Sequence, residues 1–161
     1  MSTDSVLAAA RSRLRAAPRE AYGELIVPRR VLGVGRSPRI LTRGTAWHLG
    51  VLLLTENGVM ATGDIVRARQ EVRRGYTAES QRQRAVLAAA ARRGGIAEGA
   101  VVHIDWSVLD PGAVDAGAAS GPLALHGGTP AVRWSAAGGY VPLTEYLDER
   151  IDLLLAPPAG A

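Results

Sequence analysis

One apolar segment followed by a turn signal constrains the fold more than any other part of the chain. Residues Ala46 to Leu54 are mostly apolar, and Thr55-Glu56-Asn57-Gly58 follows them directly. Asn-Gly tolerates the positive φ angles that a tight β-hairpin turn requires. The segment therefore predicts a central hairpin, whose second strand begins at Val59 and extends to Arg67.

Further strands are predicted on both sides of this hairpin. Val31–Val34 and Arg39–Arg43 are short segments bounded by proline and glycine residues. Val101–Trp106 alternates apolar and polar side chains, which is typical of a strand with one buried face. Leu123–Arg133 predicts a second hairpin that turns at Gly127-Gly128, and the small residues at 112–121 predict a loop.

Three segments have the 3.6-residue periodicity of amphipathic helices. They are Asp4–Ala17, which is capped by Thr3 or Asp4 and ends before Pro18; Ala78–Arg93, which is capped by Thr77; and Leu143–Leu155. The last of these places Leu143, Leu147, Ile151 and Leu154 on one face. Its opposite face carries four carboxylates at i, i+3, i+4 and i+7, namely Glu145, Asp148, Glu149 and Asp152. These carboxylates repel one another, so a cationic neighbour would stabilise the helix.

Strands and helices in this order predict an α+β protein. A length of 161 residues with 47% hydrophobic residues suits one domain over residues 1–161. In it we expect an N-terminal helix at 4–17, a region of sheet and helix at 29–135, and a C-terminal helix at 143–155. The expected sheet is mostly antiparallel, has six or seven strands and is covered by three helices, with a partial barrel as the alternative.

Composition excludes several classes of protein. The chain has no Cys, Lys or Phe, so it cannot form a disulfide, a thiolate metal site, a cysteine nucleophile or a lysine-containing P-loop. Arginines interrupt the first twenty residues, which argues against a secretory signal. The longest apolar run is far shorter than the roughly 20 residues that span a bilayer. We expect a cytoplasmic protein with no membrane span, no metal and no cofactor.

Charge is strongly polarised along the chain. Residues 1–94 contain 17 Arg and 7 acids, a net charge of +10, whereas residues 95–161 contain 2 Arg and 8 acids, a net charge of −6. The absence of lysine suggests codon bias, which would turn every lysine into arginine but does not by itself put nearly all of the arginines before residue 95. The asymmetry indicates a partner surface, docking of one half on the other, or pairing between copies. The predicted partner is a protein or a second copy, with nucleic acid as an alternative, and the best contact candidates are Arg67, Arg69, Arg73 and Arg74.

Histidines offer the best candidates for chemistry. In the strand at 101–106, His103 and Asp105 are predicted to share the face opposite the apolar side chains, where the carboxylate could orient the imidazole. His126 and Arg133 share the corresponding face of the second hairpin. If the two segments are neighbours, His126 and Arg133 complete a site as binding residues beside a catalytic His103 and Asp105. His48 lies on an apolar strand and is expected to be a hydrogen-bonded core residue.

Two segments carry a resemblance to known proteins. Residues 43–54 and residues 120–135 resemble a family of short bacterial proteins, some of which are labelled glutaminases. The resemblance implies hydrolysis of an amide, but it assigns no catalytic residues. Known glutaminase classes use a Ser-x-x-Lys pair, a cysteine, or a threonine with a lysine, and this chain lacks the lysine and the cysteine. A non-catalytic interaction protein is therefore the preferred prediction, with an amide hydrolase as the alternative.

Overall fold

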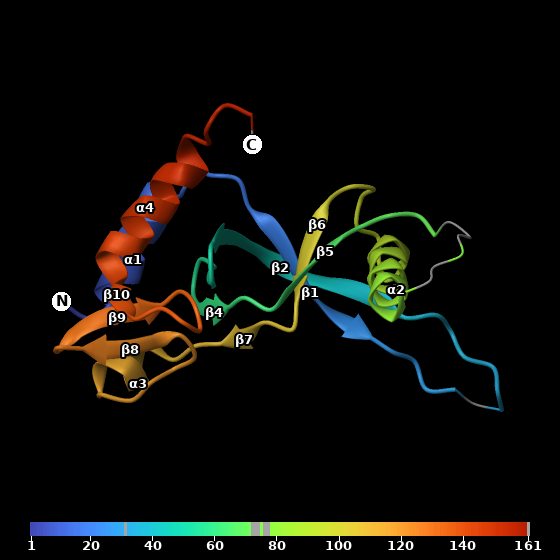
Figure 1. Ribbon diagram of the computed structural model, residues 1–161, viewed down its shortest axis with the longest axis horizontal. Coiled ribbons are helices and arrows are strands. Elements are labelled where there is room, and N and C mark those ends of the chain that lie inside the picture. The colour runs from blue at the N-terminus through green and yellow to red at the C-terminus, as the bar shows by residue number, and fades with distance from the viewer. Residues whose placement is uncertain (31, 72–74, 76–77, 161) are drawn as a thin grey trace. The chain divides into compact units, whose positions relative to one another are not determined.

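A seven-stranded sheet with the order β5-β6-β1-β2-β3-β4-β7 is the largest element of the computed structural model (Figure 1). Its strands are β1 (Glu20–Ile26), β2 (Arg39–Leu49), β3 (Leu52–Leu54), β4 (Val59–Ala61), β5 (Asp64–Arg67), β6 (Val101–Ile104) and β7 (Ser107–Val108). β1 and β6 are parallel, whereas β5–β6, β2–β3, β3–β4 and β4–β7 are antiparallel. A second, antiparallel sheet has the order β10-β9-β8, with β8 at Leu123–His126, β9 at Thr129–Arg133 and β10 at Tyr140–Pro142.

Helices complete the α+β fold. Three are long, α1 (Thr3–Arg13), α2 (Glu79–Arg93) and α4 (Leu143–Leu155), and α3 (Pro111–Asp115) is a single short turn. The predicted class, the mostly antiparallel sheet and the three long helices are confirmed. The larger sheet begins at β5 and ends at β7, so the residues that the structure describes, 1–30, 32–71, 75 and 78–160, form no barrel.

Contacts group the residues of this α+β domain into two compact units. We call Glu20–Thr45 with Gly63–Asp105 the arginine unit, and Met1–Arg19 with Ala46–Thr62 and Trp106–Ala161 the helical unit. By sequence the arginine unit contains 13 Arg and 7 acids, a net charge of +6, and the helical unit contains 6 Arg and 8 acids, a net charge of −2. Folding reduces the charge asymmetry because the basic N-terminal helix joins the acidic C-terminal helix in one unit.

In the helical unit, α1 lies beside α4 (Figure 1). Leu7 and Leu14 of the N-terminal segment and Leu147 of α4 belong to one buried cluster. On the surface, Arg13 forms ion pairs with Asp148 and Asp152. Arg13 is therefore the cationic neighbour that the acidic stripe of α4 was expected to need. All three side chains are well exposed, so each pair stabilises the unit by at most about 1 kcal/mol.

The N-terminal helix begins earlier and ends earlier than predicted. Ser2, not Thr3 or Asp4, is the N-cap, and its hydroxyl accepts a hydrogen bond from the Ser5 amide at 3.2 Å. The helix ends at Arg13, and the chain leaves it through a turn in which the Leu14 amide donates to the carbonyls of Ala10 and Arg11. Leu14 and Ala17 are nevertheless buried.

The short helix α3 was predicted as part of a loop and holds the start of α1. Asp115, at its end, accepts hydrogen bonds from the Thr3 hydroxyl at 2.5 Å and from the Thr3 amide at 2.8 Å. The Thr3 side chain is completely buried. The hydroxyl bond, followed by the amide bond, lowers the pKa of Asp115 below its ordinary value of 3.8. The carboxylate therefore acts as a capping group supplied from a distant part of the chain.

This contact predicts an acid-sensitive contribution to stability. Because the pKa of Asp115 is lowered in the folded protein, its contribution is fully present above the unfolded value near 3.8 and is lost as pH falls through the folded pKa. We expect Thr3→Val to lower the urea midpoint at neutral pH and to reduce the fall in stability between about pH 4 and pH 2. Unfolding followed by tryptophan fluorescence reads this out, since Trp47, Trp106 and Trp134 all belong to the helical unit. Parallel pH profiles for wild type and variant would contradict the assignment.

Both predicted hairpins are confirmed. Leu54 pairs with Val59 across the Asn-Gly turn, and β8 pairs with β9 across Gly127 and Gly128, which have φ angles of 59° and 78°. The strand predicted at Ala46–Leu54 is broken at Gly50, which has a φ of 65°. The strand predicted from Val59 to Arg67 is likewise divided into β4 and β5. Helix α4 matches the prediction residue for residue.

Other strand predictions were wrong. In the segment predicted as a strand at Val31–Val34, Leu32 and Gly33 form a turn with φ angles of 55° and 76°, and Leu32 is exposed. Val31 lies outside the described residues. Strands β1, β7 and β10 were not predicted. None of the helices in the described ranges is both long enough and apolar enough to cross a bilayer.

Candidate anion-binding site

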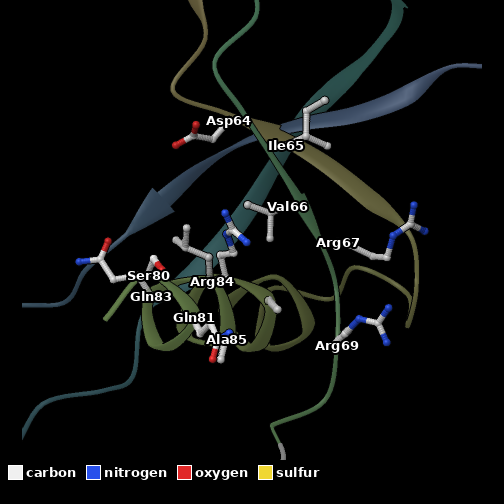
Figure 2. A pocket seen from close by; sticks show the side chains of 12 residues that line it. Asp64, Ile65, Val66, Arg67, Arg69, Ser80, Gln81, Gln83, Arg84 and Ala85 are labelled. Atoms are coloured by element: carbon white, nitrogen blue, oxygen red, sulfur yellow. The ribbon is translucent and has the colours of Figure 1, made fainter. Parts of the chain in front are cut away.

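A pocket of about 670 Å³ lies between β5 and α2 in the arginine unit (Figure 2). We call it the β5–α2 pocket. Its polar lining includes three arginines and three neutral hydrogen-bonding side chains: Arg67, Arg69, Arg84, Ser80, Gln81 and Gln83. One carboxylate, Asp64, also lines it. This composition favours negatively charged groups.

Strand alternation and helix periodicity place these side chains. Along β5 and the residue pair after it, Val66 and Ala68 are buried, so Arg67 and Arg69 point outward. The amide of Arg69 donates to the carbonyl of Ala88 at 3.2 Å and thereby ties the strand end to α2. On α2, the lining residues Gln81, Arg84, Ala85 and Ala88 recur at i, i+3, i+4 and i+7, which is one face of a helix. The pocket therefore has a regular element on each side.

Arginines of this unit fall into two groups. Three α2 arginines bind groups within the unit: Arg82 pairs with Glu79 at 3.4 Å, Arg92 pairs with Glu98 at 3.3 Å, and Arg93 donates to the carbonyl of Pro38 at 2.9 Å. By contrast, Arg69 and Arg84 are exposed, and their side chains form no hydrogen bond or ion pair with any residue that the structure describes.

Arg67 is intermediate, because its Nη1 donates to the carbonyl of Gly99 at 2.7 Å while the side chain remains exposed. In Figure 2 the guanidinium groups of Arg67 and Arg69 lie at one side of the pocket and that of Arg84 lies between α2 and β5. The three groups are spread along the pocket and do not meet at one point. The arrangement suits an extended anionic surface better than a single small anion.

The structure describes two of the four arginines that were predicted as contact residues. Arg67 and Arg69 line the pocket, whereas Arg73 and Arg74 lie outside the residues that the structure describes. Arg84 was not among the contact candidates. The helical periodicity of the sequence already separates Arg84 from Arg82, because the two lie nearly opposite each other on the helix. Only the structure shows which of these arginines form ion pairs or hydrogen bonds within the unit.

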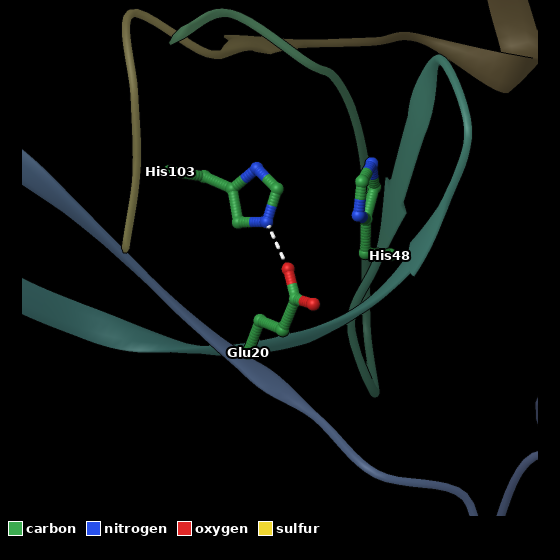
Figure 3. Close-up of side chains that lie close together, drawn as sticks. All are labelled: Glu20, His48 and His103. Atoms are coloured by element: carbon green, nitrogen blue, oxygen red, sulfur yellow. Dashed lines mark hydrogen bonds and ion pairs between the residues drawn. The ribbon is translucent and has the colours of Figure 1, made fainter. Parts of the chain in front are cut away.

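His103 does not pair with Asp105 as predicted. β6 ends at Ile104, and Asp105 is exposed with a φ of 56°, so the alternation that would put both side chains on one face stops before it. Instead, His103 Nε2 lies 2.5 Å from Oε2 of Glu20, on the parallel neighbour β1 (Figure 3). Glu20 could not be predicted as the partner because β1 was not predicted. A carboxylate-bound imidazole can act as a general base, but the His103 side chain is completely buried, which keeps substrates from it.

His126 and Arg133 belong to the helical unit, and His103 belongs to the arginine unit. Their strands, β8 and β9, belong to the three-stranded sheet, whereas β6 belongs to the seven-stranded sheet, so the segments are not paired strands. In the helical unit the two residues meet around Tyr140. The His126 ring stacks on it with centroids 5.8 Å apart, and the Arg133 guanidinium lies 5.7 Å from its centroid.

The remaining sequence predictions for polar residues are simpler. Ring atom Nε2 of His48 lies 3.0 Å from the carbonyl of Gly50, which confirms that this histidine is hydrogen-bonded. Ser120, in the predicted loop at 112–121, begins a turn in which its carbonyl accepts a hydrogen bond from the Leu123 amide at 3.0 Å. Trp134, which directly follows the second hairpin, is 50% exposed.

Comparisons with known proteins place no constraint on this site. The chain matches no protein-family model, no curated protein and no solved structure. The resemblance to the glutaminase-labelled family therefore stays a prediction from the sequence. Function has to be argued from the β5–α2 pocket itself.

Proposed function

We propose that the protein is a non-catalytic cytoplasmic interaction protein whose arginine unit binds an anionic partner in the β5–α2 pocket. The observation that carries the proposal is the exposure of Arg69 and Arg84 in one pocket, without a partner among the described residues. A guanidinium group offers five N–H donors in a fixed planar geometry that matches carboxylate and phosphate oxygens. Gln81 and Gln83 can add neutral hydrogen bonds beside them.

The most direct test is charge reversal in the pocket. Because an exposed ion pair contributes up to about 1 kcal/mol, we expect Arg69→Glu and Arg84→Glu each to weaken binding about fivefold, and the double variant to weaken it further. The probe is a fluorescein-labelled oligoglutamate peptide, and binding is followed by fluorescence anisotropy at about 0.1 M salt, where charges within roughly 10 Å are only partly screened.

A matched control separates the pocket from net charge. Arg36 is exposed in the loop after β1, belongs to the same unit and does not line the β5–α2 pocket. Arg36→Glu makes the same change in net charge, so we expect it to leave peptide binding within about twofold of wild type. An equal loss in all three variants would mean that the peptide responds only to overall charge, and the pocket assignment would be wrong.

Partner class is tested on the native partner. The tagged protein is recovered from its own cells at about 0.1 M salt, with and without nuclease, and what co-purifies is identified by mass spectrometry. Protein partners that persist after nuclease treatment support an interaction protein with an acidic partner. Partners that disappear with nuclease would contradict the proposed protein partner and support the nucleic-acid alternative, in which the same arginines contact phosphates.

A further inference from the structure

A second pocket, of about 370 Å³, lies on another face of α2 in the arginine unit. Its lining is largely apolar and includes Leu25, Val27, Pro38 and Val86. Val27 is 66% exposed and Val86 is 48% exposed, so the pocket leaves aliphatic surface in contact with water. We call it the apolar pocket. Exposed aliphatic surface next to a charged site is typical of a protein-binding surface.

The apolar pocket and the β5–α2 pocket adjoin each other along α2. Gln83 and Leu87 line both of them. Helix α2 therefore carries Arg84 on one side and Val86 on the other, and Gln83 and Leu87 lie where the two pockets meet. A partner that fills both needs acidic and aliphatic side chains close together on one surface, which a phosphate backbone does not offer.

The chain itself contains a segment of this kind. On α4, Glu145, Glu149, Asp152 and Leu153 recur at i, i+4, i+7 and i+8 and so share one face of the helix. All four are exposed, Leu153 by 43%, and Leu155 in the last turn is 49% exposed. Asp152 pairs with Arg13, but Glu145 and Glu149 form no ion pair with any residue described in the structure. The acidic and aliphatic groups of α4 complement the two faces of α2.

We propose that the anionic partner of the β5–α2 pocket is helix α4 of a second copy of this chain, with Glu149 at the arginines and Leu153 at the apolar pocket. This inference rests on the proposed function and names its partner. The units have opposite net charges, +6 and −2, which favours association of the arginine unit of one copy with the helical unit of another. When each copy donates its α4 to the other, the contact is reciprocal and the assembly closes as a dimer.

Molar mass in solution tests the inference. We expect sedimentation equilibrium of the wild-type protein at about 0.1 M salt to show a dimer that dissociates as salt rises to about 0.5 M, because exposed charges are then screened. Glu149→Arg and Arg84→Glu should each raise the dissociation constant at least tenfold, while the control Arg36→Glu leaves it unchanged. Leu153→Ser should weaken the dimer without a change in charge.

Mixing the two charge variants gives the decisive measurement. Glu149→Arg and Arg84→Glu carry opposite charges on the two proposed contact surfaces, so an equimolar mixture should recover dimers that neither variant forms alone. A monomeric wild-type protein, or a mixture that stays monomeric although the wild type dimerises, would overturn the inference.

The oligoglutamate titration distinguishes this failure from failure of the proposed function. If the wild type is monomeric but Arg84→Glu still weakens peptide binding relative to Arg36→Glu, the pocket binds an anionic partner other than a second copy. If a dimer forms and Arg84→Glu does not affect it, the dimer uses another surface, and the inference is wrong regardless of the peptide result.

Discussion

Gly94→Ala is expected to destabilise the arginine unit by about 3 kcal/mol or more, more than any other change proposed for that unit. Gly94 is the C-cap of α2, where the helix end meets β2. A methyl group at this position would lie 1.7 Å from the carbonyl oxygen of Ile40, which is completely buried. Because the obstructing atom is backbone, the clash can be relieved only by moving the helix or the strand. We expect reduced helix content and faster hydrogen exchange of the α2 amides.

The adjacent glycine provides the control. Gly95 has a φ of 94°, and a methyl group there meets nothing within 4 Å. Gly95→Ala should therefore show only the cost of a left-handed alanine, about 1 to 2 kcal/mol. Urea unfolding followed by far-UV circular dichroism compares the two variants. Equal losses would show that α2 does not approach β2 as closely as the structure has it.

Close approaches between backbone segments, such as that of Gly94 to Ile40, are the part of the fold that the sequence could not reveal. Helix α4 and the two hairpins were predicted because their signals are local: a 3.6-residue period in one case, and Asn-Gly and Gly-Gly turns in the others. Strand β1 was missed because it pairs with β6, about eighty residues later, and because a glycine interrupts it. A methyl group at that glycine, Gly23, would lie 2.4 Å from the carbonyl oxygen of Leu41, so the residue that hides the strand from prediction is the one that lets it pack.

The sequence predicted a site for an anionic partner, but it did not predict all of the residues that line the site. Clustered charge indicated an anionic partner and selected Arg67 and Arg69, both of which line the β5–α2 pocket. Distinguishing Arg84 from Arg92 required tertiary structure, since only the fold brings Glu98 to Arg92. The pairing of His103 with Glu20 depended in the same way on a strand that had not been predicted. Residue type follows from sequence, whereas the partner of each side chain follows from the fold.

In the helical unit, the largest expected effects centre on the hydroxyl group of Tyr146. This buried group donates to the carbonyl of Leu49 at 3.0 Å and accepts from the amide of Val51 at 2.9 Å, so it holds both sides of the turn between β2 and β3. Tyr146→Phe leaves both backbone groups without this partner. Since the Leu49 residue is buried, we expect a loss of about 2 kcal/mol in the free energy of unfolding, measured by tryptophan fluorescence in urea.

Gly50, at the centre of the same turn, allows the contact to be tested by a double-mutant cycle. A methyl group at Gly50 would lie 2.2 Å from the Tyr146 hydroxyl oxygen, and the φ of 65° adds backbone strain for alanine. In the wild type, Gly50→Ala should therefore cost about 3 kcal/mol, from the strain and the clash together. In the Tyr146→Phe protein the 2.2 Å clash is absent, and the backbone strain and the milder contacts with the ring and with Arg150 at 3.2 Å remain.

The double variant should accordingly be more stable than the sum of the two single losses predicts, by about 1 kcal/mol or more. Strict additivity would mean that the hydroxyl does not face Gly50. A loss of unfolding free energy in the double variant that is larger than the sum of the two single losses would mean that contacts other than the Tyr146 hydroxyl hold the turn. The coupling energy thus measures the contact between the Tyr146 hydroxyl of α4 and this turn, and it does so independently of any binding partner.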